Sequence, residues 1–174
     1  MSYQFLGAHK MSNGWRFAVW APNAYEVYVI GEFNGWNESS HKMERIGEGG
    51  IYTTFVENVA EGQMYKYLIV LADGTKLYKA DPYANYAEMR PGTASKIYDL
   101  NHFKWNDLKW MNAREKKNWF EEPISVYECH IGSWMKHPGQ QPGFYNYREF
   151  ADKLVEYLKD MRYTHVELMG VAEY

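Results

Sequence analysis

The sequence predicts a mainly β protein, with an immunoglobulin-like β-sandwich over residues 1–100 followed by an incomplete β-α-β start of a larger parallel sheet or barrel. From Gly14 to about Leu100, short alternating segments are separated by turn residues roughly every eight to twelve positions, as in β-sandwiches. After Pro123, an apolar strand, an amphipathic helix and a second strand follow in order. A parallel strand pair joined by a helix buries both faces only inside a larger sheet or barrel, so this second part is expected to be unfinished.

In half-buried strands, apolar and polar residues alternate, because successive side chains point to opposite faces of the sheet. Four segments of the first part show this alternation, at Trp15, Phe17 and Val19; Val27 and Val29; Ile51, Thr53 and Phe55; and Tyr65, Tyr67, Ile69 and Leu71. Asp73-Gly74 predicts a hairpin after the last segment, since both residues tolerate positive φ. Further turns are expected at Pro22-Asn23, Asn34-Gly35 and Asp81-Pro82.

Residues 101–122 are expected to be a linker packed on the domains, because Trp105, Trp110 and Trp119 stand among charged residues without a clean period. Residues 123–174 then hold a strand at 124–131, a helix at 147–161 and a strand at 164–169. The helix has one apolar stripe, formed by Ala151, Leu154, Val155, Leu158 and Met161.

The ends of this helix also carry signals. Asn146 with Glu149 predicts a helix N-cap related to the capping box. No glycine follows the helix where a left-handed residue is preferred, so Arg162 is expected to hold that conformation at a cost of about 1 kcal/mol.

Composition excludes several classes of function. The 174 residues carry a net charge of −3 without any cluster of basic residues, so no nucleic-acid partner is expected. The N-terminus lacks the pattern of a signal peptide and no long apolar run occurs, so we expect a cytoplasmic protein with no membrane contact. Cys129 is the only cysteine, and we expect a small buried side chain on a strand rather than a nucleophile.

Aromatic residues are abundant, with sixteen tyrosines and seven tryptophans against eight phenylalanines. Tyrosine and tryptophan combine a flat apolar face with a polar tip, which suits stacking on sugar rings. The same residues also fill the cores of small β domains, so their positions must decide between the two interpretations.

An ordered series of motifs resembles a known family. Phe17-Ala-Val-Trp-Ala-Pro-Asn23, Val29-Ile-Gly-Glu-Phe-Asn-Gly-Trp36, Asp81-Pro-Tyr83 and Arg90-Pro-Gly-Thr-Ala94 resemble the N-terminal, glycogen-binding type of sandwich of bacterial 1,4-α-glucan branching enzymes. Pro123-Ile-Ser-Val-Tyr-Glu-Cys-His-Ile-Gly-Ser-Trp134 and Phe144-Tyr-Asn-Tyr-Arg-Glu-Phe-Ala-Asp-Lys-Leu154 look like the beginning of that family's catalytic (β/α)8 barrel. The resemblance covers essentially the whole chain and implies an N-terminal fragment of an enzyme of glycogen biosynthesis.

The resemblance implies cleavage of an α-1,4-glucan and its rejoining through an α-1,6 link, with retention through a covalent glycosyl-enzyme. Retaining chemistry needs two carboxylates about 5 to 5.5 Å apart, which a barrel presents at the C-terminal ends of its strands. A whole barrel takes roughly 250 residues, and the family's carboxylates lie on its middle and late strands. The chain is therefore expected to lack them and to be inactive alone.

Three glutamates lie on or after the two barrel-like strands, namely Glu128, Glu167 and Glu173. No known geometry pairs any of them with a second catalytic carboxylate, so we expect each to be structural. His130 is expected to be structural or to lie at the rim of a cleft. The six histidines show no metal-ligand spacing, and neither a metal nor a cofactor is expected.

The resemblance also implies a platform for an α-glucan partner. Trp36 matches the family's aromatic residue after Phe-Asn, Lys66 matches a lysine on a following strand, and Tyr78 approximately matches an aromatic residue past the hairpin. A polar residue near the Gly-Thr turn falls on Ser95 or Lys96, which departs from the family pattern. Trp36 has an alternative structural role as a loop residue packed on the sandwich, and Lys66 borders either solvent or a ligand hydroxyl.

Two alternatives to a branching-enzyme fragment stay open. One is a stand-alone glycan-binding or interaction module, and the other is a fragment of a debranching enzyme or trehalose-releasing hydrolase of the same superfamily. The residues after Pro123 argue against the first, because a free module has no use for an unfinished strand-helix-strand unit. Val166, Leu168 and Val171 would then form an unfinished barrel edge, through which self-association is expected.

Overall fold

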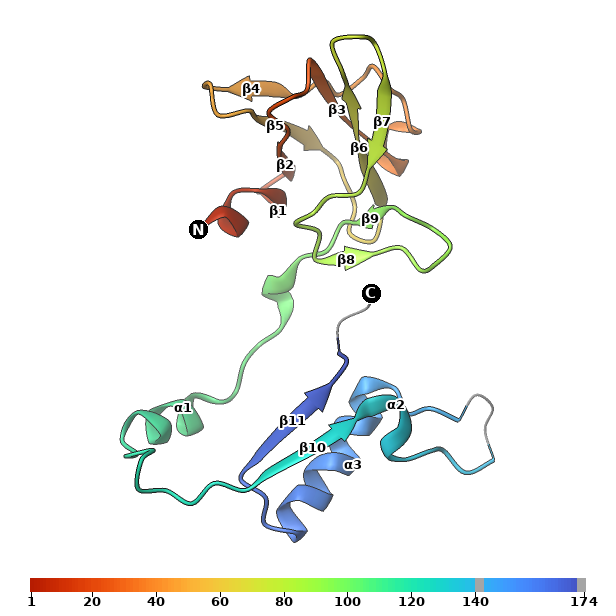
Figure 1. The fold of residues 1–174 in the computed structure, drawn as a ribbon. Helices are drawn as coiled ribbons and strands as arrows, with labels where there is room; N and C mark the ends of the chain where they lie inside the picture. Colours follow the sequence, from red (N-terminus) through yellow and green to blue (C-terminus); the bar gives the residue numbers. More distant parts are fainter. Residues whose placement is uncertain (140–142, 172–174) are drawn as a thin grey trace. The chain divides into compact units, whose positions relative to one another are not determined.

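The computed structural model describes residues 1–139 and 143–171, and the chain divides into two compact units, Met1–Trp105 and Asn106–Tyr174 (Figure 1). The first unit contains two antiparallel sheets, and the second contains a pair of parallel strands with helices. The expected mainly β architecture with a sandwich is confirmed.

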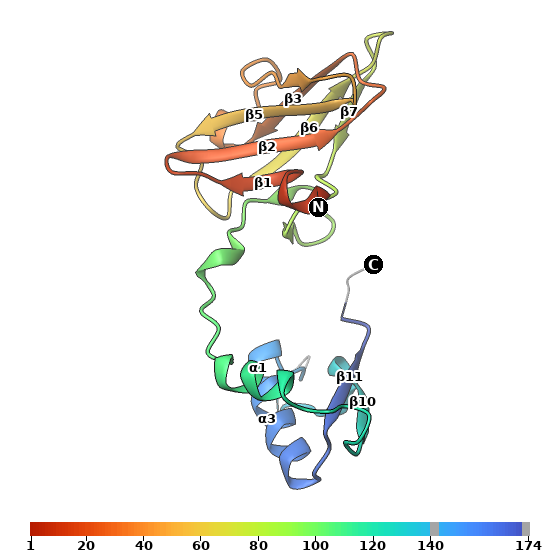
Figure 2. The ribbon, with the colours of Figure 1, turned by 90° about the vertical axis from the view of Figure 1, so that its left-hand side faces the viewer.

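Two sheets lie face to face in the first unit (Figure 2). The β2 sheet has the strand order β1 (Gly7–Lys10), β2 (Gly14–Trp20), β5 (Ile51–Glu57) and β4 (Glu44–Ile46). The β6 sheet is built on β6 (Met64–Val70), which pairs with β3 (Glu26–Gly31), β7 (Lys76–Lys79) and β9 (Ser95–Lys96), while β8 (Tyr86–Ala87) pairs with β9. Short 3-10 helices are η1 (Ser2–Gln4), η2 (Glu32–Asn34) and η3 (Leu100–His102).

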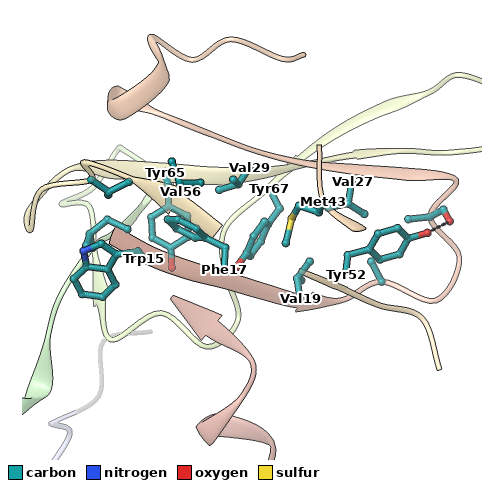
Figure 3. Close-up of a cluster of buried hydrophobic side chains, with 14 residues drawn as sticks. Trp15, Phe17, Val19, Val27, Val29, Met43, Tyr52, Val56, Tyr65 and Tyr67 are labelled. Atoms are coloured by element: carbon teal, nitrogen blue, oxygen red, sulfur yellow. Dashed lines mark hydrogen bonds between the residues drawn. The ribbon is translucent and has the colours of Figure 1, made fainter. Parts of the chain in front are cut away.

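Large apolar and aromatic side chains fill the space between these sheets (Figure 3). The ring of Phe17 meets the edge of the Tyr65 ring at 5.2 Å between centroids, and the Tyr52 hydroxyl donates a hydrogen bond of 2.8 Å to the Ala24 carbonyl. Full burial of such a side chain stabilises the fold by roughly 1.5–3 kcal/mol. Part of the aromatic excess therefore belongs to the core, whose main members are Trp15, Phe17, Val19, Val27, Val29, Met43, Tyr52, Val56, Tyr65, Tyr67 and Ile97.

Strand β5 forms as expected, but a different face of it is buried. Tyr52 and Val56 point into the core, whereas Phe55 is exposed. In the register of the β2 sheet, Val56 lies opposite Trp15 and Tyr52 opposite Val19, so these side chains share the face of the buried β2 residues. Both faces of β5 carry apolar residues, and only this pairing decides which one is buried.

A buried carboxylate ties the β6 sheet to the turn after β7. One Asp81 oxygen accepts hydrogen bonds from the hydroxyls of Tyr65 (2.7 Å) and Tyr67 (3.1 Å), and the other accepts from the Tyr83 amide (2.8 Å). The Asp81 amide donates to the Ser95 hydroxyl at 2.8 Å. Burial raises the pKa of Asp81 despite these hydrogen bonds, and burial beside Asp81 raises the pKa of both tyrosines. The turn expected at Asp81-Pro82 is thus fixed from inside the sandwich.

The second unit contains the expected strand-helix-strand motif. Strands β10 (Val126–His130) and β11 (His165–Met169) pair in parallel, and helix α3 (Tyr147–Asp160) packs Phe150 and Leu154 against Cys129. Cys129 is buried on a strand, as expected, and burial raises the pKa of its thiol. A one-turn helix, α2 (Ile131–Trp134), follows β10 directly.

The predicted ends of α3 are also confirmed. The Asn146 side chain accepts from the amides of Arg148 and Glu149, and the Glu149 carboxylate accepts from the Asn146 amide at 3.0 Å. Arg162 holds the left-handed conformation with φ of 61°. Of the predicted stripe, Leu154 is buried, while Val155 and Met161 are exposed.

Residues 101–122 are more regular than expected. They include helix α1 (Leu108–Glu115), which the sequence did not indicate because its residues form no apolar stripe. Within the second unit, the Trp119 ring lies 6.4 Å from the His165 ring. The assignment of 101–122 as a linker between domains stays a prediction.

Candidate functional site

The three residues predicted for the platform meet at one cavity on the outer side of the β6 sheet. Trp36, Lys66 and Tyr78 come from the loop after β3, from β6 and from β7, and together they line a cavity of about 300 Å³. The other lining residues are Ile30, Glu38, Met64, Glu88 and Ala94. Lys66 faces this side because Tyr65 and Tyr67 alternate with it and point into the core.

The motif Phe33-Asn34-Gly35-Trp36 builds the loop that presents the tryptophan. The Phe33 ring packs 5.7 Å from Phe17 and so anchors the loop to the core. The Asn34 side chain accepts from the Gly31 amide at 3.0 Å and donates to the Val29 carbonyl at 3.1 Å. The backbone then turns at Gly35 and Trp36, and the Trp36 amide closes the turn by donating to the Gly31 carbonyl at 2.8 Å.

Trp36 has an unusual backbone. Its φ is 61°, in the left-handed region, where a side chain other than glycine costs roughly 1–2 kcal/mol. The residue is 38% exposed and lines the cavity. Strain of this kind persists when the surroundings impose it and is concentrated at functional sites.

Lys66 is held by the turn between β8 and β9. Its ammonium donates to the Thr93 hydroxyl at 2.7 Å. Neither residue expected near this turn meets Lys66, because Ser95 is buried at Asp81 and the Lys96 ammonium lies over the Tyr86 ring at 5.3 Å. Thr93, two residues before Ser95, is thus the polar residue near the Gly-Thr turn that contacts Lys66.

Glu38 connects the tryptophan loop to β7. Its carboxylate accepts hydrogen bonds from the Lys76 ammonium, at 2.6 Å, and from the Tyr78 hydroxyl. These two donors lower the pKa of the Glu38 carboxyl, and the hydrogen bond to Glu38 raises the pKa of the Tyr78 hydroxyl. Sequence reasoning missed Glu38, although it stands only two residues after Trp36.

Glu88 lies close to Gly92 beside the cavity. The Glu88 carboxylate accepts from the Ala94 amide at 3.0 Å, and a side chain at Gly92 would approach the Glu88 carboxyl carbon to 2.0 Å. Glu88 and Ala94 both line the cavity. A side chain at position 92 would therefore displace the Glu88 carboxylate from this place.

The candidates of the second unit form no comparable site. Glu128 and Glu167 lie opposite each other in β10 and β11 and are both exposed. The His130 ring lies 3.3 Å from the Ser133 hydroxyl at the end of β10. Glu173 falls outside the described residues. Within residues 1–139 and 143–171, no group of three or more histidine, cysteine, aspartate or glutamate side chains could hold a metal ion.

Comparisons of the sequence identify similar proteins. Residues 5–84, which include Trp36, Lys66 and Tyr78, match the model of carbohydrate-binding module 48, the isoamylase N-terminal domain. The chain is 58% identical to the 1,4-α-glucan branching enzyme GlgB of Butyrivibrio fibrisolvens and 48% identical to that of Halothermothrix orenii. Each alignment covers 99% of this chain and 28% of the relative, so the chain spans about a quarter of the length of these relatives.

Solved structures show the same fold at lower identity. A putative α-amylase from Salmonella typhimurium superposes with a TM-score of 0.68 and 23% identity, over 98% of this chain and 25% of that one. The pullulanase of Klebsiella pneumoniae in complex with maltotriose gives a TM-score of 0.68 and 20% identity, over 97% of this chain and 18% of that one. The chain thus carries a carbohydrate-binding module 48 and is, over nearly its whole length, a homologue of the N-terminal part of the bacterial 1,4-α-glucan branching enzymes.

Proposed function

We propose that the cavity of Trp36, Lys66 and Tyr78 binds an α-glucan of the glycogen or amylose type. The observation that carries the proposal is the convergence of these three side chains, from three separate segments, on one cavity. Two aromatic faces suit stacking on glucose rings, and the Lys66 ammonium can donate to a sugar hydroxyl. The match to a carbohydrate-binding module supports the same ligand class.

The cavity is also suited to a neutral ligand. The Glu38 carboxylate is paired with Lys76, and Lys66 already donates to a hydroxyl group, that of Thr93. A glucose hydroxyl can take the place of the Thr93 hydroxyl without leaving a charge unpaired. No phosphate or carboxylate on the ligand is needed for recognition.

We further propose that these residues serve a 1,4-α-glucan branching enzyme of glycogen biosynthesis in the cytoplasm, because the relatives that align with the whole chain carry that name. Branching chemistry by retention requires two carboxylates on barrel strands. Glu128 and Glu167 are neighbours on adjoining strands, and we assign them a structural role. On this proposal, neither glutamate takes part in catalysis.

The binding proposal is tested by electrophoresis in native gels with and without glycogen. We expect glycogen to retard the chain and Trp36→Ala to weaken the retardation. Tyr25→Ala is the matched control, because Tyr25 is an exposed aromatic residue that does not line this cavity. Equal mobility with and without glycogen would show that the sandwich is purely structural.

The catalytic assignment is tested with amylose. We expect the purified chain to leave the iodine spectrum of amylose unchanged and to release no reducing ends. Turnover by the chain, if abolished by Glu128→Gln or Glu167→Gln, would contradict the structural role of these glutamates.

No helix in the described part of the chain is long and apolar enough to cross a membrane.

In the second unit, Val166, Leu168 and Val171 line an apolar groove of about 330 Å³ together with one side of α3. We propose that an isolated chain self-associates through this surface, because exposed apolar strand edges pair readily with one another.

A further inference from the structure

We propose that Glu38 is a positioning residue, which fixes the distance between the rings of Trp36 and Tyr78 and thereby sets the affinity of the cavity for a glucan. The inference rests on the proposed function of this cavity. It concerns a side chain that lines the cavity but whose two hydrogen bonds are directed toward β7.

The two rings stand on separate segments of the chain. Trp36 belongs to the loop after β3, whereas Tyr78 belongs to β7, which pairs with β6. A glucan that stacks on both rings needs them at a fixed separation, and any freedom between the segments is lost on binding at an entropic cost. A link between loop and strand would remove that cost in advance.

Glu38 supplies this link. Its two carboxylate oxygens accept from Lys76 and Tyr78, which are two residues apart on β7 and therefore point to the same side of the strand. The Glu38 carboxylate is thus hydrogen-bonded to two successive side chains on that side of β7, those of Lys76 and Tyr78. The hydrogen bond from the Tyr78 hydroxyl also restricts the rotation of the very ring that faces the glucan.

The loop transmits the restraint to Trp36. The Asn34 side chain donates to the Ser40 hydroxyl at 3.1 Å, and the Asn37 side chain accepts from the Ser39 amide at 2.9 Å. The backbone on either side of Glu38 is therefore held by local hydrogen bonds. Because only Asn37 separates Trp36 from Glu38, a fixed Glu38 carboxylate limits where the Trp36 ring can lie.

The link contributes little to the fold itself. The side chains of Glu38 and Lys76 are 40% and 51% exposed, and ion pairs in such positions contribute little to stability. Loss of Glu38 is therefore expected to weaken glucan binding while leaving the unfolding midpoint nearly unchanged. This separation distinguishes a positioning residue from a residue that supports the sandwich.

The test is a double-mutant cycle with maltoheptaose, measured by calorimetry. Glu38→Gln and Tyr78→Phe should each raise the dissociation constant about tenfold, and the double variant no further, because both changes break the same link. Glu48→Gln, a matched change on another loop, should leave the constant unchanged. Independent effects that multiply in the double variant would show that Glu38 contacts the glucan directly and would overturn the proposal.

A second readout does not need the glucan. With 5-fluorotryptophan incorporated, the Trp36 resonance, assigned by its loss in Trp36→Ala, should shift or broaden equally in Glu38→Gln and Tyr78→Phe. The resonance of Trp15, which is buried in the core, serves as the control. An unchanged Trp36 resonance in Glu38→Gln would overturn the positioning role. If the resonance responds but maltoheptaose does not bind, the proposed function fails and the positioning role stands.

Discussion

Trp36 combines two properties that seldom occur together in a purely structural residue. Its backbone is left-handed, and its ring lies at a cavity beside Lys66 and Tyr78. The loop imposes this conformation through hydrogen bonds of Asn34 and Gly31 rather than through any preference of tryptophan. Selection for the fold alone would favour glycine or asparagine at this position.

Replacing Trp36 with glycine separates the two roles that the sequence left open. Glycine removes the ring and also relieves the left-handed strain, so the free energy of unfolding should stay within about 1 kcal/mol of the wild type. Glucan binding should be lost. Urea denaturation and glycogen electrophoresis measure the two effects, and a loss of several kcal/mol with intact binding would indicate a structural tryptophan.

Asp81 predicts a pH dependence of stability. Its pKa is raised in the folded state by burial, so the folded state binds the proton at higher pH than the unfolded state does. The stability contribution of Asp81 should therefore increase as the pH falls from neutral through the raised pKa, and level off below the ordinary pKa. Raising the pH through this window should lower stability.

Asp81→Asn isolates this contribution. The amide group cannot replace both carboxylate oxygens as acceptors for Tyr65 and Tyr83, so we expect a loss of about 1–3 kcal/mol. Urea denaturation of both proteins between neutral and acidic pH gives the difference in unfolding free energy. The advantage of the wild type should grow toward acidic pH, and a constant difference would contradict the raised pKa.

At the scale of single elements, α3 shows how local sequence signals determine the ends of a helix. Asn146 and Glu149 satisfy amide groups at its beginning, and both residues were recognisable from their spacing. At its end, the Tyr163 amide donates to the Leu158 carbonyl at 3.0 Å across the left-handed Arg162. The helix therefore ends at a left-handed residue, a conformation that suits glycine, but the residue at this position is Arg162.

Arg162→Gly should stabilise the end of α3 by about 1 kcal/mol, because glycine adopts the left-handed conformation without strain. Hydrogen exchange of the last amides of α3 is the measurement, and we expect roughly tenfold slower exchange, which corresponds to about 1.4 kcal/mol at most. Arg148→Gly, near the beginning of the same helix, is the control and should accelerate exchange. Faster exchange in Arg162→Gly would show that the arginine side chain outweighs the strain.

At the scale of the whole molecule, the two units differ in how completely their apolar surface is covered. The sandwich encloses one core between two sheets. In the second unit, all residues of β11 are exposed, and in the described part of the chain β11 pairs with β10 alone. A parallel pair of this kind is normally covered on both faces.

This difference predicts concentration-dependent self-association of the isolated chain. Size-exclusion chromatography with light scattering should show oligomers that increase with concentration, and Val166→Lys should reduce them, because a charge on a strand edge opposes pairing. Ile46→Lys, at an exposed position of β4 in the sandwich, is the matched control. A monomer at all concentrations with one cooperative melting transition would contradict the prediction.

Local patterns in the sequence were sufficient for strands β2, β3, β5 and β6, the hairpin at Asp73-Gly74, the cap at Asn146 and the conformation of Arg162. They were also sufficient to select Trp36, Lys66 and Tyr78, through resemblance to a family. These features depend on residues close together in the chain, or on a motif that can be compared directly. Helix α1 was not predicted from the sequence, because its residues form no apolar stripe.

Only the tertiary structure decided which face of β5 is buried, that Asp81 is a core residue, and that Glu38 and Thr93 form hydrogen bonds with Tyr78 and Lys66 of the candidate site. Each of these depends on pairing between strands that are distant in sequence. Both faces of β5 are apolar, and a carboxylate in a turn has the same sequence signature whether it meets solvent or two buried hydroxyls. The sequence by itself determined the family and the main strands and helix α3, whereas long-range register and burial decided the contacts within the candidate site.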